Sequence, residues 1–282
     1  MRYTFATIFL IFLFGCTNTV QERNLREVNT LTFNIRYHDT IPGLNHWESR
    51  REEVAEILKQ SKADFIGLQE AEPTQIAYLD MQLHMSYDCV FRTREAKPTE
   101  GEATPIFYDK RKWKLINSGT RWLSDTPDSA GSKTYGNFYP RIYTWGAFQM
   151  IGSTKMVYVY NTHFDHQSKK ARDQSARQIV RAIMEKGHRP VILMGDFNAE
   201  SGDESINYLT HNGYISFMDA YGKDSTSVTY HGWEPKDEFP GKRIDYIMMS
   251  TGSEVIDKKV ITAEQGNHPP SDHYPVWVKM RI

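Results

Sequence analysis

Residues 190–199 read PVILMGDFNA, an apolar run that ends in an acid and an amide. The run at 190–194 is short and is bounded by a proline and a glycine, which favours a buried strand. Asp196 and Asn198 follow the end of that strand. Ligand-binding groups in open α/β sheets collect at strand ends, so the stretch predicts an α/β fold with a site at this edge. Because Gly, Asp and Asn also favour turns, the stretch alone fits a simple turn equally well.

Further segments place polar side chains at the ends or starts of apolar strands. They are Leu68-Gln69-Glu70, Asn161-Thr162-His163-Phe164-Asp165, Arg243-Ile244-Asp245-Tyr246 and Ser271-Asp272-His273, with Asn34 inside a first strand. Each has a structural alternative: Glu70 could lead into a helix, where an acid is favourable, and His163 could be a structural histidine. Acids, amides and histidines placed together in this way indicate a metal-assisted acid–base site.

Strand and helix patterns cover the chain from residue 28 to residue 282 without a second linker or an internal repeat. Alternation and short apolar runs predict strands near 30–37, 64–69, 86–92, 104–109, 112–122, 142–151, 155–163, 190–194, 243–249, 254–262 and 274–281. Helical spacing predicts one helix capped by Asn45, one opened by Pro73, and two more at 168–186 and 203–211. Strands outnumber helices and both halves begin β-α-β. We therefore expect one mixed α/β (α+β) domain over 28–282, with two mixed sheets packed face to face and helices outside.

The composition is that of a globular protein. Of the 282 residues, 39% are hydrophobic and 24% are charged, which excludes a collagen-like chain, a coiled coil and a disordered acidic tail protein. The 34 Lys and Arg residues nearly balance the 35 Asp and Glu residues, giving a net charge of −1. This balance gives no support for a bulk electrostatic grip on nucleic acid. Two cysteines cannot build a disulfide framework.

The first residues have the pattern of a secretory signal. An arginine precedes an apolar run at 5–14 that contains one threonine, and this run is too short to span a bilayer as a helix. It continues into LFGC at 13–16, which resembles a bacterial lipoprotein signal; the alternative is an ordinary secretory signal with a chance cysteine. We expect a signal peptide at 1–15, a lipid on Cys16 and a polar tether over 16–27. The protein would then be extracytoplasmic and membrane-anchored, on the periplasmic side or at the cell surface.

Together these segments resemble the endonuclease/exonuclease/phosphatase superfamily. Its members include pancreatic-type deoxyribonucleases, apurinic endonucleases, neutral sphingomyelinases, inositol polyphosphate 5-phosphatases and deadenylases. The resemblance runs from Leu31 to the C-terminus and is strongest at 68–70, 195–199, 243–247 and 271–276. It implies a four-layer α/β sandwich, which agrees with the expected strand pattern, and an activity on phosphoesters.

The resemblance also implies which residues bind metal and phosphate. Glu70 matches the family's principal metal ligand, and Asn34 and Asp272 match its supporting positions. Hard oxygen ligands of this kind suit Mg²⁺, and Mn²⁺ accepts the same ligands. Asp196 and Asn198 match the pair that orients the attacking water and binds the phosphate.

Two histidines match catalytic positions of the family. His273 matches the general base, a role that suits an ordinary imidazole pKa of about 6.5, and Asp245 matches the acid that fixes its tautomer. In some relatives the position of Asp196 is instead the proposed base, so these two roles could exchange. His163 matches a second histidine, found in the deoxyribonuclease branch, that faces the phosphate. Glu102 stands where that branch has a glutamate to steady this histidine.

Three further residues are candidates for substrate binding. Arg141 resembles an arginine that contacts the phosphate, since a guanidinium suits a bidentate contact with its oxygens. His231 and Trp233 lie in loop-rich sequence that could rim the site, where an exposed aromatic ring can stack on a base or a sugar. Packing of the loop onto the body of the domain is the alternative for both.

These residues predict a Mg²⁺-dependent phosphodiesterase or phosphatase that acts on a small phosphoester or a lipid head group by in-line attack of an activated water. The basic clusters are small, at 110–112, 169–170 and 258–259, so a long nucleic acid is not favoured as substrate. An extracytoplasmic Mg²⁺-dependent endo- or exonuclease is the alternative. A lipoprotein binding module with a silent site is less favoured, because it has no need of a complete acid–base set. We expect a monomer.

Overall fold

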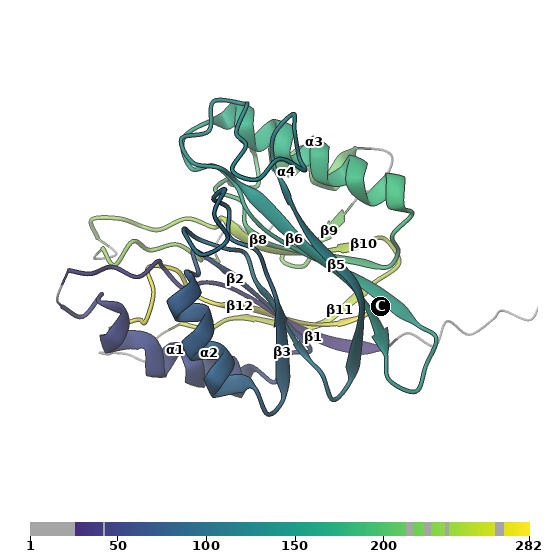
Figure 1. The fold of residues 1–282 in the computed structure, drawn as a ribbon, viewed down its shortest axis with the longest axis horizontal. Coiled ribbons are helices and arrows are strands. Elements are labelled where there is room, and N and C mark those ends of the chain that lie inside the picture. The colour runs from purple at the N-terminus through teal and green to yellow at the C-terminus, as the bar shows by residue number, and fades with distance from the viewer. Residues whose placement is uncertain (1–25, 42, 213–216, 223–226, 235–236, 263–267) are drawn as a thin grey trace, which may run out of the picture.

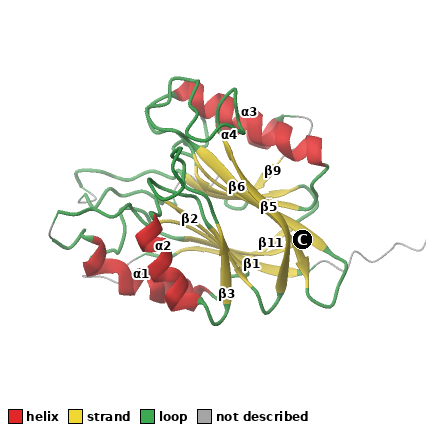
Figure 2. Ribbon diagram, viewed as in Figure 1, coloured by secondary structure: helices red, strands yellow, loops and turns green. Residues whose placement is uncertain are grey.

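The computed structural model describes residues 26–282 except 42, 213–216, 223–226, 235–236 and 263–267. Two six-stranded sheets pack face to face and a pair of helices covers each outer face, so the chain forms the predicted four-layer sandwich (Figures 1 and 2). The predicted signal peptide at 1–15, the lipidation site Cys16 and most of the predicted tether lie outside the described residues. Within the described part of the chain, no helix has the length and apolarity needed to cross a membrane.

The first sheet has the strand order β11-β12-β1-β2-β4-β3. Its strands are β1 (Glu27–Asn34), β2 (Phe65–Gln69), β3 (Tyr87–Val90), β4 (Ile106–Asp109), β11 (Glu254–Val260) and β12 (Val276–Arg281). Strands β1 and β2 run parallel, with Asn34 opposite Gln69, and the other pairings are antiparallel. The carboxyl ends of β1 and β2 therefore meet at one edge of the sheet.

The second sheet has the strand order β5-β6-β7-β8-β10-β9. Its strands are β5 (Trp113–Trp122), β6 (Ile142–Met150), β7 (Met156–His163), β8 (Val191–Asp196), β9 (Phe217–Asp219) and β10 (Asp245–Ser250). Strands β7 and β8 run parallel, with His163 opposite Asp196, and β10 pairs antiparallel to β8 with Asp245 opposite Asp196. Three predicted site residues thus meet at the end of β8.

Three hydrophobic clusters fill the spaces between the four layers. One lies between the sheets and contains the rings of Phe65 and Phe148, whose centroids are 4.9 Å apart. A second joins the first sheet to α1 (Trp47–Ser61) and α2 (Pro73–Leu83). The third joins the second sheet to α3 (Lys169–Lys186) and α4 (Glu204–His211). The strand ends that carry the polar motifs are therefore supported from both sides by packed core.

Three differences from the predicted elements have a clear physical reason. Strand β1 ends at Asn34 rather than at residue 37, because Arg36 leaves the extended conformation with a φ of 58°. Helix α1 is capped by the His46 side chain, which accepts a backbone N–H of the first turn, and not by Asn45 as predicted. The short strand β9 was not predicted, because three residues are too few to show a period-two pattern.

Gly195 allows β7 and β8 to approach closely just before Asp196. Its φ is 149°, and a Cβ atom at this position would overlap the backbone of Thr162. We expect Gly195→Ala to lower the free energy of unfolding by about 2 kcal/mol or more, because the added methyl group has neither a favourable φ nor space. Urea denaturation would measure this, with Gly202→Ala as the control, since a Cβ there meets no atom within 4 Å. Equal stability of the two variants would contradict the prediction.

Candidate active site

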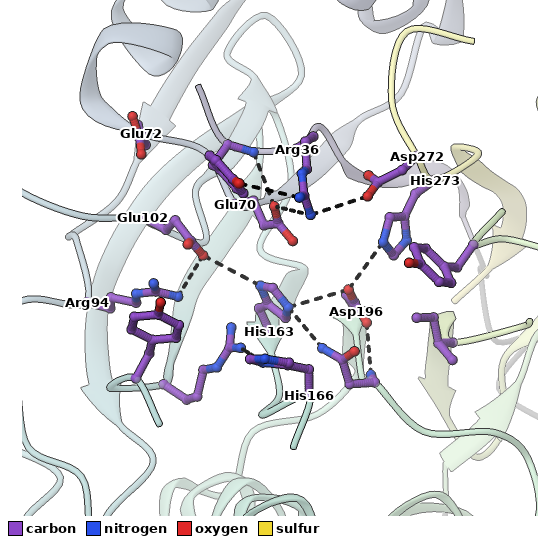
Figure 3. Close-up of a pocket in the computed structure, with 16 residues that line it drawn as sticks. Arg36, Glu70, Glu72, Arg94, Glu102, His163, His166, Asp196, Asp272 and His273 are labelled. Carbon is purple, nitrogen blue, oxygen red and sulfur yellow. Dashed lines mark hydrogen bonds and ion pairs between the residues drawn. The ribbon is translucent and has the colours of Figure 1, made fainter. Parts of the chain in front are cut away.

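A pocket of about 600 Å³ opens at the edge where the two parallel strand pairs end (Figure 3). Predicted site residues from both sheets and their loops line it: Glu70, Glu102, Arg141, His163, Asp196, Asn198, Asp272 and His273. Asn34 and Asp245 are buried directly behind these residues, and each is hydrogen-bonded to a lining side chain. The structure thus brings together ten of the residues that the sequence singled out.

His273 and Asp245 form a buried pair on one side of the pocket. His273 Nδ1 lies 2.8 Å from Asp245 Oδ2, and its Nε2 lies 3.8 Å from Asp196 Oδ2. Burial opposes a positive charge on His273, but the attraction of Asp245, Asp196 and Asp272 outweighs it and raises the pKa of His273 to about 10. The ring is therefore an imidazolium at neutral pH, and it can stabilise negative charge in the pocket.

Asp196 ends β8 at the centre of the site. Its Oδ2 accepts a hydrogen bond from Asn34 Nδ2 at 3.0 Å, and its Oδ1 accepts one from the backbone N–H of Asn198 at 2.8 Å. The first of these bonds joins the two sheets, because Asn34 ends β1. Burial and the charge of Asp245 raise the pKa of Asp196 to about 7. A carboxylate with a pKa near neutrality is suited to accept a proton at physiological pH.

His163 faces Asp196 from the end of β7. Its Nε2 lies 3.5 Å from Asp196 Oδ2 and 3.0 Å from Asn198 Nδ2, so the amide donates to this nitrogen and the ring proton is assigned to Nδ1. Nδ1 in turn faces Glu102 Oε2 at 4.0 Å, the neighbour that the sequence predicted. Burial and nearby arginines hold the pKa of His163 well below its ordinary value, so this ring is neutral.

The side of the pocket beyond His163 is lined by arginines and aromatic rings. Glu102 Oε2 accepts a hydrogen bond from Arg94 Nη1 at 2.7 Å, yet burial still raises the pKa of Glu102 to about 7. The guanidinium of Arg94 lies 4.5 Å from the centre of the Tyr139 ring. Arg141 is buried, with its Nη2 3.0 Å from His166 Nδ1. Arg94 supplies positive charge on the side opposite His273 (Figure 3), and Arg141 adds a second guanidinium to the pocket lining.

Glu70 and Asp272 lie on either side of Arg36. Glu70 Oε1 accepts from Asn34 Nδ2 at 3.1 Å, and Oε2 accepts from the backbone N–H of Tyr37 at 3.2 Å. Arg36 Nη1 is 3.7 Å from Glu70 Oε2 and 3.3 Å from Asp272 Oδ2 (Figure 3). Burial disfavours the charge on Glu70, but Arg36 and Asn34 outweigh it and hold the pKa of Glu70 below its ordinary value. Glu70 is therefore ionised at neutral pH.

The pocket is rich in carboxylates, which fits a bound divalent cation. Five carboxylates line it, Glu70, Glu72, Glu102, Asp196 and Asp272, beside the guanidinium groups of Arg36, Arg94 and Arg141 and the imidazolium of His273. Burial raises the pKa values of Asp196 and Glu102, and a neighbouring carboxylate adds to each shift, Asp245 for Asp196 and Glu70 for Glu102. Carboxylate oxygens are the ligands that Mg²⁺ and Mn²⁺ prefer.

Two groups of side chains could hold this cation. One is Glu70 with Asp272, as predicted; Asn34 turns its amide nitrogen to Glu70, so here it positions that carboxylate. The other is Asp196, Asp245 and His273, whose ligand atoms lie within 4.8 Å of one another. Asp245 and His273 already use their facing atoms on each other, which favours the first group.

His231 and Trp233 do not line this pocket, contrary to the prediction. They line a second cavity of about 700 Å³. Tyr230, their neighbour, is in an extended bridge and does line the active-site pocket. Alternate side chains of an extended segment face opposite ways, so His231 points away from the pocket when Tyr230 points into it. Both His231 and Trp233 pack against neighbouring rings, which is the loop-packing alternative.

Arg36 and Arg94 line the pocket but were not predicted. Arg36 stands two residues after Asn34, where the alternation of the first strand breaks down, and this was the only signal for it. Arg94 lies in the polar stretch after β3 and has no local signal, because its contact with Glu102 depends on how that stretch folds back.

Two mixed sheets whose parallel strand ends share an acid–histidine pocket define a class of phosphoester hydrolases. The sequence places the chain in that class: it belongs to the Endonuclease/Exonuclease/phosphatase family, whose sequence model matches residues 31–273. The structure of an endonuclease/exonuclease/phosphatase from Bacteroides vulgatus is 32% identical, with a TM-score of 0.84 over 90% of this chain and 98% of that one.

Two other proteins are similar over different lengths. A mannosyl-6-phosphatase from Bacteroides thetaiotaomicron is 29% identical, with a TM-score of 0.78 over 90% of this chain and 99% of that one. An uncharacterized protein of Acanthamoeba polyphaga mimivirus is 26% identical over 173 residues, which span 58% of this chain and 63% of that protein, less than two thirds of its length. The first of these similarities extends over most of this chain.

Proposed function

We propose that this protein is a divalent-metal-dependent phosphatase that releases phosphate from small, hydroxyl-rich phosphomonoesters, with sugar phosphates as the leading class. The observation that carries the proposal is the position of Asp196 between a charged His273 and a neutral His163 in a pocket that also holds three arginines. The similarity to a mannosyl-6-phosphatase over nearly the whole domain supports a sugar phosphate as substrate.

Asp196 accepts the proton of the attacking water in the proposed reaction. Burial and Asp245 raise the pKa of Asp196 to about 7, so a large fraction of it is ionised and basic at neutral pH. His273 stays protonated and faces Asp196, where its charge lowers the free energy of the transition state as negative charge develops on the phosphoryl group. This assignment gives Asp196 the role of base, one of the two alternatives that the sequence left open.

Glu102 supplies a proton to the leaving oxygen from the other side of the pocket. Burial raises the pKa of Glu102 to about 7, so its carboxyl group carries a proton part of the time at neutral pH. His163 stands between Glu102 and Asp196 and is neutral, with its Nδ1–H turned to Glu102, so it lines this side of the pocket without adding a fixed charge (Figure 3). Arg94 and Arg141 neutralise the phosphate on the same side.

A divalent cation held by Glu70 and Asp272 would polarise the phosphoryl oxygens and neutralise their charge. We expect Glu70→Gln to raise the Mn²⁺ concentration for half-maximal activity by about tenfold or more, because one negative charge leaves the proposed cation site. Titration of phosphate release against Mn²⁺ would test this, with Glu100→Gln, an exposed acid paired with Lys97, as the control. A Mn²⁺ requirement equal to that of the wild type would rule out Glu70 as a ligand.

The position of the chain ends favours a soluble substrate over a lipid head group. Arg26 N donates to Ile282 O at 3.0 Å at the beginning of β1, whereas Asn34 at the other end of β1 adjoins the pocket. At about 3.3 Å per residue, an eight-residue strand separates these points by about 26 Å. With a lipid on Cys16, as we propose for this extracytoplasmic protein, the tether would join the domain at the start of β1, the end of that strand opposite Asn34.

Phosphate release by the purified protein tests the proposal. The panel holds mannose 6-phosphate, glucose 6-phosphate, a synthetic phosphodiester, sphingomyelin vesicles and supercoiled plasmid, each with Mg²⁺, Mn²⁺ or chelator. We expect metal-dependent release of phosphate from the sugar phosphates, with a kcat/KM at least about tenfold above that for the diester. A tenfold ratio corresponds to about 1.4 kcal/mol of stronger transition-state binding. Plasmid nicking without release from sugar phosphates would replace the proposal by the nuclease alternative. No turnover of any phosphoester by folded protein would contradict the hydrolase assignment.

A further inference from the structure

Arg36 occupies an unusual position between the two carboxylates of the proposed cation site. Its Nη1 contacts both Glu70 and Asp272, and no other Lys or Arg among the described residues lies within 4.0 Å of either acid. The Nε of Arg36 is buried and has no hydrogen-bond partner in the described part of the chain. The guanidinium therefore has donors left over, on a side chain that remains 31% exposed at the pocket wall.

The backbone of Arg36 is strained and is held in place by its neighbours. Its φ of 58° lies in the left-handed region, which is costly for a non-glycine residue and is found where the surroundings impose it. The Arg36 carbonyl accepts from Arg50 Nη2 at 3.0 Å and from Gln75 Nε2 at 2.9 Å, and its N–H donates to Asn34 Oδ1 at 3.0 Å. Both backbone polar groups of Arg36 are thus hydrogen-bonded, which fixes the residue from which the side chain extends into the site.

Arg50 extends this support to both walls of the cation site. It is buried, and its guanidinium also donates to the carbonyl oxygens of Ile35, Tyr37 and Pro270. Pro270 lies two residues before Asp272, so one side chain connects the segment that carries Arg36 to the loop that carries Asp272. The contact of Arg36 with the two acids is therefore built into the fold.

We infer that Arg36 is a phosphate-binding residue whose guanidinium competes with the divalent cation for Glu70 and Asp272. This inference rests on the proposed function. Two positive charges next to the same pair of carboxylates repel each other. A cation bound at Glu70 therefore weakens the ion pairs of Arg36 with Glu70 and Asp272. The freed guanidinium then has its Nε and Nη donors available for two oxygens of the substrate phosphate, the bidentate geometry that suits this group.

The test measures binding rather than turnover. Isothermal titration calorimetry would follow Mn²⁺ binding, and then inorganic phosphate binding to the Mn²⁺-loaded protein, for the wild type, Arg36→Gln and Arg36→Lys. Arg121→Gln is the matched control, because Arg121 is 30% exposed and is paired with Asp128 outside this pocket. Circular dichroism and melting temperature would confirm that each variant is folded.

Arg36→Gln is expected to bind Mn²⁺ about tenfold more tightly and phosphate about tenfold more weakly, because it removes a charge that opposes the metal and attracts the anion. Arg36→Lys should leave Mn²⁺ affinity near the wild-type value and still weaken phosphate, since an ammonium group lacks the bidentate fork. Mn²⁺ affinity that is unchanged or weaker in Arg36→Gln, or unchanged phosphate affinity, would overturn the inference. Failure of every variant and of the wild type to bind Mn²⁺ would instead contradict the proposed function.

Discussion

Replacing His273 by alanine is expected to lower kcat on a sugar phosphate by about 10²- to 10⁴-fold, the range of a lost acid–base or charge-stabilising group. The ring lies 3.8 Å from Asp196, and its charge lowers the pKa of that carboxyl group against the opposing effects of burial and Asp245. Without the ring, Asp196 holds its proton more tightly and loses basicity at neutral pH. The pocket also loses the imidazolium that faces the phosphoryl group.

Phosphate release at saturating substrate and Mn²⁺ would measure the loss, since a group that acts in the transition state changes kcat more than KM. His84→Ala is the matched control, because His84 is an exposed histidine at the end of α2 and should leave the rate unchanged. Melting curves of both variants would show whether the fold is intact. A folded His273→Ala protein that retains more than about a tenth of the wild-type rate would show that His273 has no such role.

The strand-end motifs predicted the centre of the pocket for a simple geometric reason. Parallel strands bring their carboxyl ends to the same edge, so a short apolar run followed by a polar residue locates that residue at the edge. Glu70 after β2, His163 at the end of β7 and Asp196 at the end of β8 all follow this pattern. The same alternating and apolar runs predicted the two mixed sheets, because each strand buries one face against its neighbouring layer.

The residues that were missed depend on tertiary contacts with no local pattern. Arg36 reaches the site because Arg50 and Gln75 hold its carbonyl in a left-handed turn, and neither residue is close to it in sequence. His231 and Trp233 were predicted to rim the site because they are aromatic residues in loop-rich sequence, but the side to which each points depends on the conformation of the segment around Tyr230. Sequence patterns predict the position of backbone segments better than the direction in which long side chains point.

Asp245→Asn is expected to lower kcat by about 10³-fold and to change the pH dependence of the remaining activity. The variant keeps the shape of the side chain but removes the charge that, with its hydrogen bond, most strongly opposes the effect of burial on His273. The pKa of His273 therefore falls, and the imidazolium is lost at a lower pH than in the wild type. Activity that requires the imidazolium declines as pH rises, so the alkaline limb of the pH–rate profile should move to lower pH.

The direction of this alkaline limb decides between the two roles that the sequence left open. If His273 were the base, its neutral form would be active, and activity would rise with pH through its pKa. Asp245→Asn would then move that rise to lower pH and increase the neutral fraction at pH 7. If Asp196 is the base and His273 the charged partner, activity falls with pH and falls earlier in the variant. Profiles of kcat/KM for the wild type, Asp245→Asn and the exposed control Asp88→Asn would separate the two, because Asp88 pairs with Lys110 outside the pocket.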